Sequence, residues 1–328
     1  MPTPILPVRI AGAATVTPGK AVTTVELARQ IEWDRDPAEV ERRTGIRARY
    51  FAPQGTTAAE VATAALRKAL DQARLGAEDL ERIIFVNSSG GDVLIPATAN
   101  RVAASLGLSA TCDCFDLNNA CLGFLSAFDV AARGIATGSG PVGVVAVELG
   151  SRFIGPEDPR PYLVFGDGAA AVIVEHSRDG GGILGTYLRN DGPAGGDVSL
   201  EHPGLTRQRE TVRFGGSNRR ITDLAIAYAR RSANTVLAAA GLQLSEIEWI
   251  LPHQPNGSML QLLVRELGIE PARVVPVVEE VGSMGSASIP MSLDRLLRSG
   301  HVRSGDRLLM IGVGAGVSFG AILLRWEP

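Results

Sequence analysis

The chain has 328 residues, of which 45% are hydrophobic and 20% are charged, a composition typical of a globular protein with one large or two medium cores. Its formal net charge of -3 provides no general attraction to nucleic acid. Three cysteines are not expected to form a disulfide framework, the first residues are not typical of a signal peptide, and no apolar run reaches about 18 residues. We therefore expect a cytoplasmic protein that does not cross a membrane.

Four segments of the first half recur in the same order in the second half. The pairs are 75–90 with 242–257, 100–108 with 261–269, 116–138 with 278–300, and 143–150 with 306–314. Such a repeat predicts a duplicated β-α-β unit, with mostly parallel sheets that helices cover. We predict an N-terminal half, 1–180, that packs against a C-terminal half, 181–328, and an irregular surface excursion at 189–222.

Cys121 lies between the polar run "DLNNA" and an apolar stretch with helical spacing. The buried face of this helix is predicted to contain Leu122, Leu125, Phe128 and Ala132. A thiol in the first turn of a helix lies beside unpaired N–H groups and the positive end of the helix dipole, which lower its pKa and can hold an oxyanion. The alternative is a small side chain that fills a core, because free cysteine is among the most buried residue types. This segment alone leaves both interpretations open.

The second half carries the polar groups that are predicted to meet Cys121. The repeat aligns Cys121 with Ser283, each in a strand-to-helix turn, so pseudo-symmetry would bring the two turns together. His253 and Asn256 follow a predicted strand in "LPHQPNG". A lone histidine in such a place is often only a structural hydrogen-bonding group, but the repeat directs this one towards Cys121. We therefore predict that His253 is catalytic and that three loops form one site.

Two other motifs are predicted to be structural. Cys112 and Cys114 alternate in a strand and are expected in the core, because a Cys-x-Cys without a nearby histidine or a second pair is a poor zinc site. The glycines of "GVGAGVSFGAILLRW" lead into a strand and not into a helix, so they do not form a dinucleotide-binding loop. We predict a tight turn between two strands, with N–H groups that face the site.

Six motifs resemble the ketoacyl-acyl-carrier-protein synthase III family, over nearly the whole chain. They are "RRTGIRARYFA" (42–52), "NNACLGF" (118–124), "FGDGAAAVIVE" (165–175), "LPHQPN" (251–256), "GSASIPMSLD" (285–294) and the terminal "GVGAGVSFGAILLRW". The resemblance implies a thiolase-like α/β fold with duplicated halves in a five-layer α-β-α-β-α arrangement. It also implies a homodimer formed by edge-to-edge pairing of sheets.

The resemblance also implies a two-step reaction. Cys121 would take an acyl group from a thioester, in an oxyanion hole formed by the N–H groups of Cys121 and Gly316. Asn256 would support the active-site loop. His253 would bind the thioester carbonyl of a malonyl-type extender while that extender loses carbon dioxide and attacks. No metal or permanently bound cofactor is implied, and the substrates would be thioesters of acyl carrier protein or coenzyme A.

The sequence departs from the family pattern at positions that bear on the reaction and the donor. Ser283 stands where the family has an asparagine, and loss of a well-placed oxyanion donor costs about 100-fold or more in rate. Glu39 stands where members primed from coenzyme A often have a tryptophan, although Trp33 is nearby, and Ser258 stands where some members have a basic residue. Arg152, which matches an arginine that contacts a nucleotide or phosphate, is retained.

These departures leave the donor and the acceptor open. Carrier-protein thioesters are favoured over coenzyme A, and seven arginines between Arg207 and Arg231 offer a basic face to an acidic carrier protein. The alternative is a solvated, arginine-rich loop and helix. The first hypothesis for function is carbon–carbon bond formation between two acyl thioesters, in fatty-acid or polyketide and other secondary-metabolite synthesis. The second is acyl transfer to a hydroxyl, amine or carbon acceptor without decarboxylation, and the third is a non-catalytic partner subunit.

Overall fold

Two β-sheets organise the molecule. The computed structural model describes residues 4–31, 36–202, 206 and 211–328, so that Trp33, Arg207 and Arg209 lie outside the described residues. All strands of the first large sheet come from residues 8–176, and all strands of the second come from residues 182–325. The chain passes from one sheet to the other at residues 177–181.

Equivalent strands occupy equivalent places in the two sheets. The first sheet contains, in spatial order, β1 (Val8–Val16), β7 (Asp167–His176), β6 (Val142–Leu149), β4 (Arg82–Val86) and β5 (Asp113–Leu117). The second contains, in the corresponding order, β8 (Gly182–Asn190), β13 (Ser318–Arg325), β12 (Arg307–Gly314) and β11 (Trp249–Pro252). A single parallel bridge between Ile250 and Val274 takes the place of the fifth strand. This duplication is the one that the sequence repeat predicts.

The prediction of mostly parallel sheets is wrong. The pairs β4–β5, β4–β6 and β11–β12 are parallel, but β1–β7, β6–β7, β12–β13 and β8–β13 are antiparallel. For β12 and β13 the reason lies in the connection, because a parallel pair needs a crossover of about a dozen residues or more, whereas a short turn makes the next strand antiparallel. The short segment η8 (Ala315–Val317) joins β12 directly to β13 in this way.

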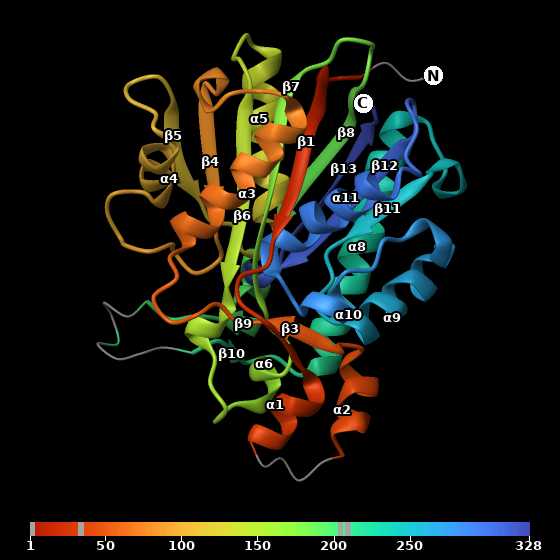
Figure 1. Ribbon diagram of the computed structural model, residues 1–328. Helices are drawn as coiled ribbons and strands as arrows, with labels where there is room; N and C mark the ends of the chain where they lie inside the picture. Colours follow the sequence, from red (N-terminus) through yellow and green to blue (C-terminus); the bar gives the residue numbers. More distant parts are fainter. Residues whose placement is uncertain (1–3, 32–35, 203–205, 207–210) are drawn as a thin grey trace.

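Helices form three layers around the two sheets (Figure 1). Helices α3 (Ala58–Ala73) and α4 (Thr98–Leu106) pack on the outer face of the first sheet, and α8 (Asn218–Ala240) and α9 (Gly257–Leu267) pack on the outer face of the second. Helices α5 (Gly123–Ala136) and α11 (Ser288–Ser299) lie between the sheets. The predicted five-layer α-β-α-β-α arrangement is confirmed.

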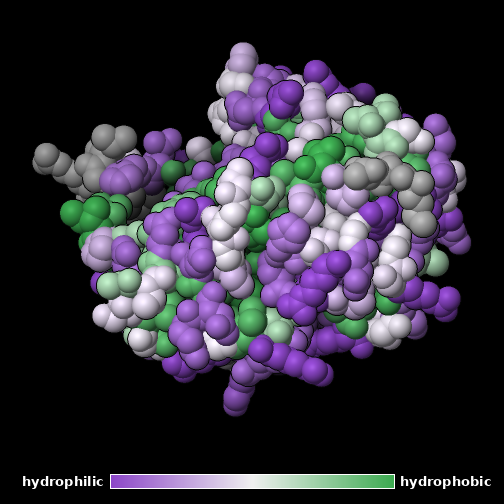
Figure 2. All heavy atoms as spheres, turned by 90° about the horizontal axis from the view of Figure 1, so that it is seen from above, coloured by the Kyte–Doolittle hydropathy of each residue, from purple (hydrophilic) through white to green (hydrophobic). Residues whose placement is uncertain are grey.

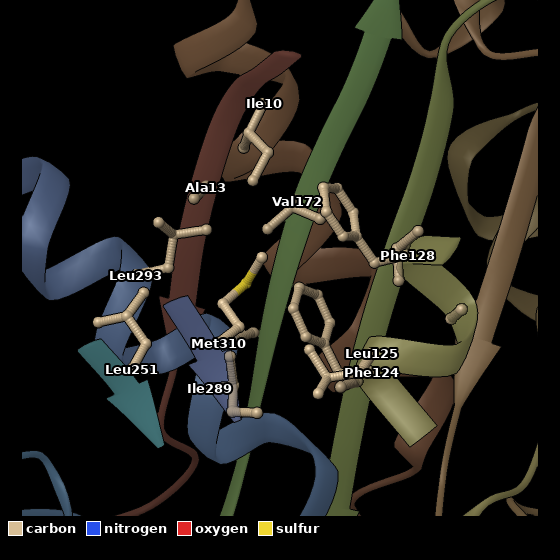
Figure 3. Packing of buried hydrophobic residues seen from close by; sticks show 14 of the residues in the cluster. Ile10, Ala13, Phe124, Leu125, Phe128, Val172, Leu251, Ile289, Leu293 and Met310 are labelled. Atoms are coloured by element: carbon tan, nitrogen blue, oxygen red, sulfur yellow. The ribbon is translucent and has the colours of Figure 1, made fainter. Parts of the chain in front are cut away.

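The central helix layer is an apolar core to which both sheets contribute (Figure 3). Side chains such as Phe124 of α5, Ile289 of α11 and Met310 of β12 pack there together. The face predicted for the helix after Cys121 is fully buried, at Leu122, Leu125, Phe128 and Ala132. Burial of one large aliphatic or aromatic side chain contributes about 1.5–3 kcal/mol, so this core holds the start of α5, and with it Cys121, in a fixed place.

Shorter elements lie around this frame. They are β2 (Ala21–Thr23), α1 (Thr24–Gln30), α2 (Pro37–Thr44), β3 (Ala48–Tyr50), α6 (Pro159–Tyr162), β9 (Val198–Ser199), β10 (Arg213–Phe214) and α10 (Val278–Val281). Strands β9 and β10 pair with each other inside the predicted excursion 189–222, and α8 begins before that excursion was expected to end.

The surface is predominantly hydrophilic on the face seen in Figure 2, where hydrophobic residues are visible as a band between polar ones. Among the described residues, no helix has both the length and the apolar character that crossing a membrane requires.

We expect Gly12 to be required by the packing of β1 on α3. A Cβ atom at this position would lie 2.2 Å from the backbone oxygen of Ala69, and a helix backbone cannot move aside cheaply. Gly12→Ala should therefore lower the free energy of unfolding by about 1–3 kcal/mol, measured by urea denaturation. Gly196→Ala is the matched control, because nothing lies within 4 Å of its Cβ position, and it should leave the free energy of unfolding within about 0.5 kcal/mol of the original.

Candidate active site

Cys121 lies in a sharply bent turn between β5 and α5. The preceding residue, Ala120, has φ 45°, a left-handed conformation that costs a non-glycine residue about 1–2 kcal/mol. The side chain of Asn118 accepts a hydrogen bond from the N–H of Ala120 at 3.0 Å, and Asn119 accepts one from the hydroxyl of Ser318 at 2.6 Å. These contacts tie the turn to the second sheet and hold Cys121 in η2 (Ala120–Leu122), directly before α5.

The two strand-to-helix turns that the repeat aligns do meet. A Cβ atom at Gly123 would lie 3.6 Å from Cβ of Ser286, in η7 (Gly285–Ala287) of the second half. A Cβ atom at Gly314 would lie 3.0 Å from the backbone nitrogen of Cys121, so the end of β12 also packs directly on the cysteine turn. The predicted approach of the two turns is confirmed.

One cavity of about 480 Å³ is lined by five of the six residues predicted for the site. They are Cys121, His253, Asn256, Ser283 and Gly316. Much of the remaining wall is apolar and includes Ile221, Leu224, Met259, Leu262, Val313 and Val317, while Arg43 and Arg160 add positive charge. The irregular excursion contributes Val198 and Phe214, so it is part of the cavity wall and not only a surface feature.

Of the two interpretations that the sequence leaves open for Cys121, the structure does not support the lowered pKa. Burial raises the pKa of the Cys121 thiol to about 12, and the negative charge of Glu148 acts in the same direction. Hydrogen bonds from the backbone of Ala315 and of Cys121 itself act in the opposite direction but do not outweigh burial. The cysteine lies in η2, directly before the first turn of α5. At neutral pH the free site therefore contains a thiol.

His253 is neutral at neutral pH. It follows β11, is 7% exposed, and its backbone N–H donates to the carbonyl of Ile311 at 2.8 Å. Burial lowers the pKa of its imidazole to about 4, against a hydrogen bond with the backbone of Gly285 that raises it. Within the described part of the chain, Nδ1 has no hydrogen-bond partner. A neutral imidazole on the wall of the same cavity as a thiol can accept the proton of that thiol.

The other predicted residues occupy distinct places around the cavity. Ser283 is 3% exposed, and its N–H donates to the carbonyl of Val164 at 2.8 Å. The side chain of Asn256 accepts a hydrogen bond from the N–H of Met259 at 2.8 Å and so caps α9. Gly316, with φ 72°, adopts the left-handed conformation that glycine tolerates best.

Three predicted residues do not line the cavity. Arg152 forms an ion pair with Asp92 at 3.2 Å and donates to the carbonyl of Thr56. Cys112 and Cys114 are half-buried at the edge of the first sheet, with their sulfur atoms 3.8 Å apart, so the expectation of full core burial is only partly met.

Sequence reasoning missed Ala315, Asn119 and Glu148. The backbone of Ala315, one residue before the predicted Gly316, makes the hydrogen bond to the Cys121 thiol. The side chain of Asn119 fixes the cysteine turn through Ser318. The polar run before Cys121 could have indicated Asn119, but Glu148 appears in the sequence only as the end of an apolar strand.

Comparison with known proteins identifies the family. Sequence profiles of 3-oxoacyl-[acyl-carrier-protein (ACP)] synthase III match residues 115–192, and those of its C-terminal part match residues 237–326. A beta-ketoacyl-[acyl-carrier-protein] synthase III from Methylococcus capsulatus is 34% identical, over 97% of this chain and 98% of that protein. The chain belongs to the 3-oxoacyl-[acyl-carrier-protein] synthase III family. It is therefore an enzyme, an acyltransferase of the condensing type.

Solved structures of this family and of similar proteins have the same architecture. The 3-oxoacyl-(acyl carrier protein) synthase III, FabH, from Pseudomonas aeruginosa has a TM-score of 0.90 at 30% identity, and 98% of each chain is covered. Xanthomonas campestris OleA, solved as a single-residue variant, has a TM-score of 0.88 at 26% identity, with 99% of this chain and all of that chain covered. The thiolase-like fold of this synthase III family member extends through nearly its whole length.

Proposed function

We propose that this enzyme joins two acyl thioesters through an acyl group carried on Cys121, in a Claisen-type condensation of fatty-acid or polyketide synthesis. The observation that carries the proposal is that the thiol of Cys121 and the neutral imidazole of His253 line one largely apolar cavity. Apolar walls suit an acyl chain, and the neutral imidazole suits a base. One similar structure, that of OleA with bound lauric acid and lauroyl-CoA, supports a cavity of this kind for acyl thioesters.

In the first step His253 takes the proton of the Cys121 thiol while the sulfur attacks the thioester carbonyl. The N–H groups of Cys121 and Ala315, which both approach this sulfur, would stabilise the oxyanion, with Gly316 on the same wall. The tetrahedral intermediate then collapses, its carbon–sulfur bond to the donor breaks, and the proton held by His253 passes to the departing thiolate. The acyl group remains on Cys121.

In the second step a malonyl-type thioester loses carbon dioxide and becomes an enolate. Its carbon attacks the acyl carbonyl, the bond to Cys121 breaks, and the thiolate takes up one proton to restore the thiol. The imidazole of His253 and the hydroxyl of Ser283 would face the developing enolate oxygen. Because Ser283 is buried and offers one donor on a short arm, we expect this decarboxylation to be slow.

Thioesters of an acidic acyl carrier protein are the proposed donors. Arg43 and Arg160 line the cavity, and the side chain of Arg219 at the start of α8 is 93% exposed. Some of the positive charge is already paired, because Arg219 lies 3.7 Å from Asp223 and Arg220 lies 2.8 Å from Asp197. Complementary charge of this kind mainly accelerates encounter.

A homodimer is the proposed assembly. Strand β5 lies at the edge of the first sheet, and such an edge can pair with a second copy of the same strand. In the loop between β4 and α4, Leu94 and Ile95 are 76% and 87% exposed. Exposed apolar side chains near an unpaired strand edge support an interface there.

The reaction is tested by following the two steps separately. After incubation with a series of acyl carrier protein and coenzyme A thioesters, intact-mass spectrometry should detect one acyl group on the protein. Addition of malonyl carrier protein should then remove this group and release an equal amount of carbon dioxide. Transfer of the acyl group without carbon dioxide release would overturn the condensation and favour a non-malonyl acceptor, as the serine at position 283 allows.

Ser283→Asn should accelerate the second step. The longer amide arm restores the donor that the family has at this position, and an oxyanion donor is worth about 100-fold or more, so carbon dioxide release should increase by one to two orders of magnitude. Formation of the acyl-enzyme should change little, because the first step does not use this side chain. Ser105→Asn, at an exposed serine that does not line the cavity, is the control and should leave carbon dioxide release unchanged. An unchanged rate in Ser283→Asn would mean that this side chain does not contact the enolate.

A further inference from the structure

Glu148 is a buried acid near the proposed nucleophile, and the two steps above give it no role. It is the penultimate residue of β6 and is 7% exposed. Within the described part of the chain, burial raises the pKa of its carboxyl group, hydrogen bonds from Ser286 and Ser88 act in the opposite direction, and no positive charge is among the causes. Burial of a carboxylate without a nearby cation lowers the stability of the folded protein. We therefore expect Glu148 to have a function that offsets this cost.

The carboxyl group of Glu148 connects the two halves of the molecule. Its Oε1 accepts hydrogen bonds from the hydroxyl of Ser88 at 2.6 Å, from the hydroxyl of Ser286 at 2.5 Å and from the N–H of Ser286 at 3.1 Å. Ser88 follows β4 in the first half, whereas Ser286 belongs to η7 in the second half, three residues after Ser283. The carboxyl group therefore fixes the turn that carries Ser283.

The same contacts reach both groups of the proposed reaction. Gly285, whose backbone is hydrogen-bonded to His253, packs so closely on Glu148 that a Cβ atom would lie 3.0 Å from Cδ of that carboxyl group. Ser286 in turn packs on Gly123, two residues after Cys121. Cys121 in η2 and His253 after β11 thus both adjoin this network, and the charge of Glu148 acts to raise the pKa of the Cys121 thiol.

We propose that Glu148 is a positioning residue for the cysteine reaction, which holds the Ser283 turn against the first half and places a negative charge beside the thiol of Cys121. The hydrogen bonds of Glu148 and its negative charge have opposite effects on the reaction. The hydrogen bonds favour condensation because they fix the groups around the enolate. The charge opposes formation of a free thiolate, so Cys121 loses its proton only when His253 and the oxyanion donors act on a bound thioester. This inference rests on the proposed nucleophilic role of Cys121.

The two effects are separated by Glu148→Gln, which keeps the shape of the side chain and removes its charge. Alkylation of Cys121 by iodoacetamide is measured against pH at the level of the Cys121 peptide, which excludes signal from Cys112 and Cys114. Because removal of a like charge favours the thiolate, the midpoint of alkylation should move to lower pH by about one unit, which is about tenfold faster alkylation at a given pH. Condensation, measured as carbon dioxide release, should change little, because the amide oxygen can still accept the hydrogen bonds from Ser88 and Ser286.

The control is Glu175→Gln, another buried glutamate, which pairs with Arg9 and Arg178 and lies outside the network. It should leave the midpoint of Cys121 alkylation unchanged. Damage to the fold would also lower the midpoint, because exposure removes the burial that raises the pKa of Cys121, so the comparison is made only where Glu148→Gln has the urea unfolding curve of the original enzyme. An unmoved midpoint in folded Glu148→Gln therefore overturns the proposal.

A second measurement applies even where Glu148→Gln does not fold. In the original enzyme the midpoint of Cys121 alkylation should lie above that of an ordinary cysteine, about 8.5, and a midpoint at or below this value also overturns the proposal. Alkylation needs no acyl substrate. Failure of the proposed condensation would therefore appear as missing acyl-enzyme or missing carbon dioxide, while the alkylation midpoint still reports on Glu148.

Discussion

Cys121→Ala should form no acyl-enzyme at all. The proposed reaction carries the acyl group on this sulfur, and among the residues that line the cavity Cys121 is the only cysteine. Without the covalent intermediate, condensation should fall by at least about 10⁴-fold, the scale seen when an enzyme loses its nucleophile. The measurement is intact-mass spectrometry after incubation with an acyl thioester, followed by the assay of carbon dioxide release.

The matched controls are the other two cysteines of the chain. Cys112→Ala and Cys114→Ala remove thiols that are half-buried at the sheet edge and do not line the cavity. Each should acylate as fast as the original enzyme, because neither sulfur adjoins the oxyanion donors. An acyl adduct that persists in Cys121→Ala, or one that disappears in Cys114→Ala, would place the acyl group on another residue and refute the proposed reaction.

The repeat in the sequence was sufficient to predict which turns meet. Alignment of Cys121 with Ser283 depends only on the order of strand, turn and helix, and the close packing of Gly123 on Ser286 follows from it. The direction of the strands was not predictable in the same way. A short turn joins β12 to β13, but residues 150–166 join β6 to β7, and the sequence gave no signal that the two strands of either pair run in opposite directions.

The protonation state of Cys121 could not be predicted from the sequence either. A helix start after Cys121 suggested a thiolate, but the pKa depends on how many atoms surround the sulfur and on which charges lie near it. Burial and Glu148 both raise the pKa, and the relation of Glu148 to Cys121 exists only after the first sheet has folded. The choice between Ala315 and Gly316 as the N–H group nearest the sulfur likewise depends on the path of the turn between β12 and β13.

His253→Asn should slow formation of the acyl-enzyme by about 10²–10⁴-fold at neutral pH, the usual contribution of a general base. The pKa of His253, about 4, and that of Cys121, about 12, mean that the free site contains a neutral imidazole and a thiol. Transfer of the proton during attack is then the accessible route. Replacing the imidazole by an amide, which cannot accept a proton, leaves only the small fraction of Cys121 that is already ionised.

The pH dependence of acylation distinguishes this role of His253 from a structural one. In the original enzyme the rate should be flat across neutral pH and should fall as the pH decreases through about 4, because His253 then already carries a proton. In His253→Asn the rate should follow the thiolate fraction and increase about tenfold per pH unit until the pKa of Cys121 is approached. His301→Asn, at an exposed histidine, should retain the flat profile. Equal profiles for the original enzyme and His253→Asn would show that the imidazole does not take the proton, since a loss of packing alone lowers the rate without changing its slope against pH.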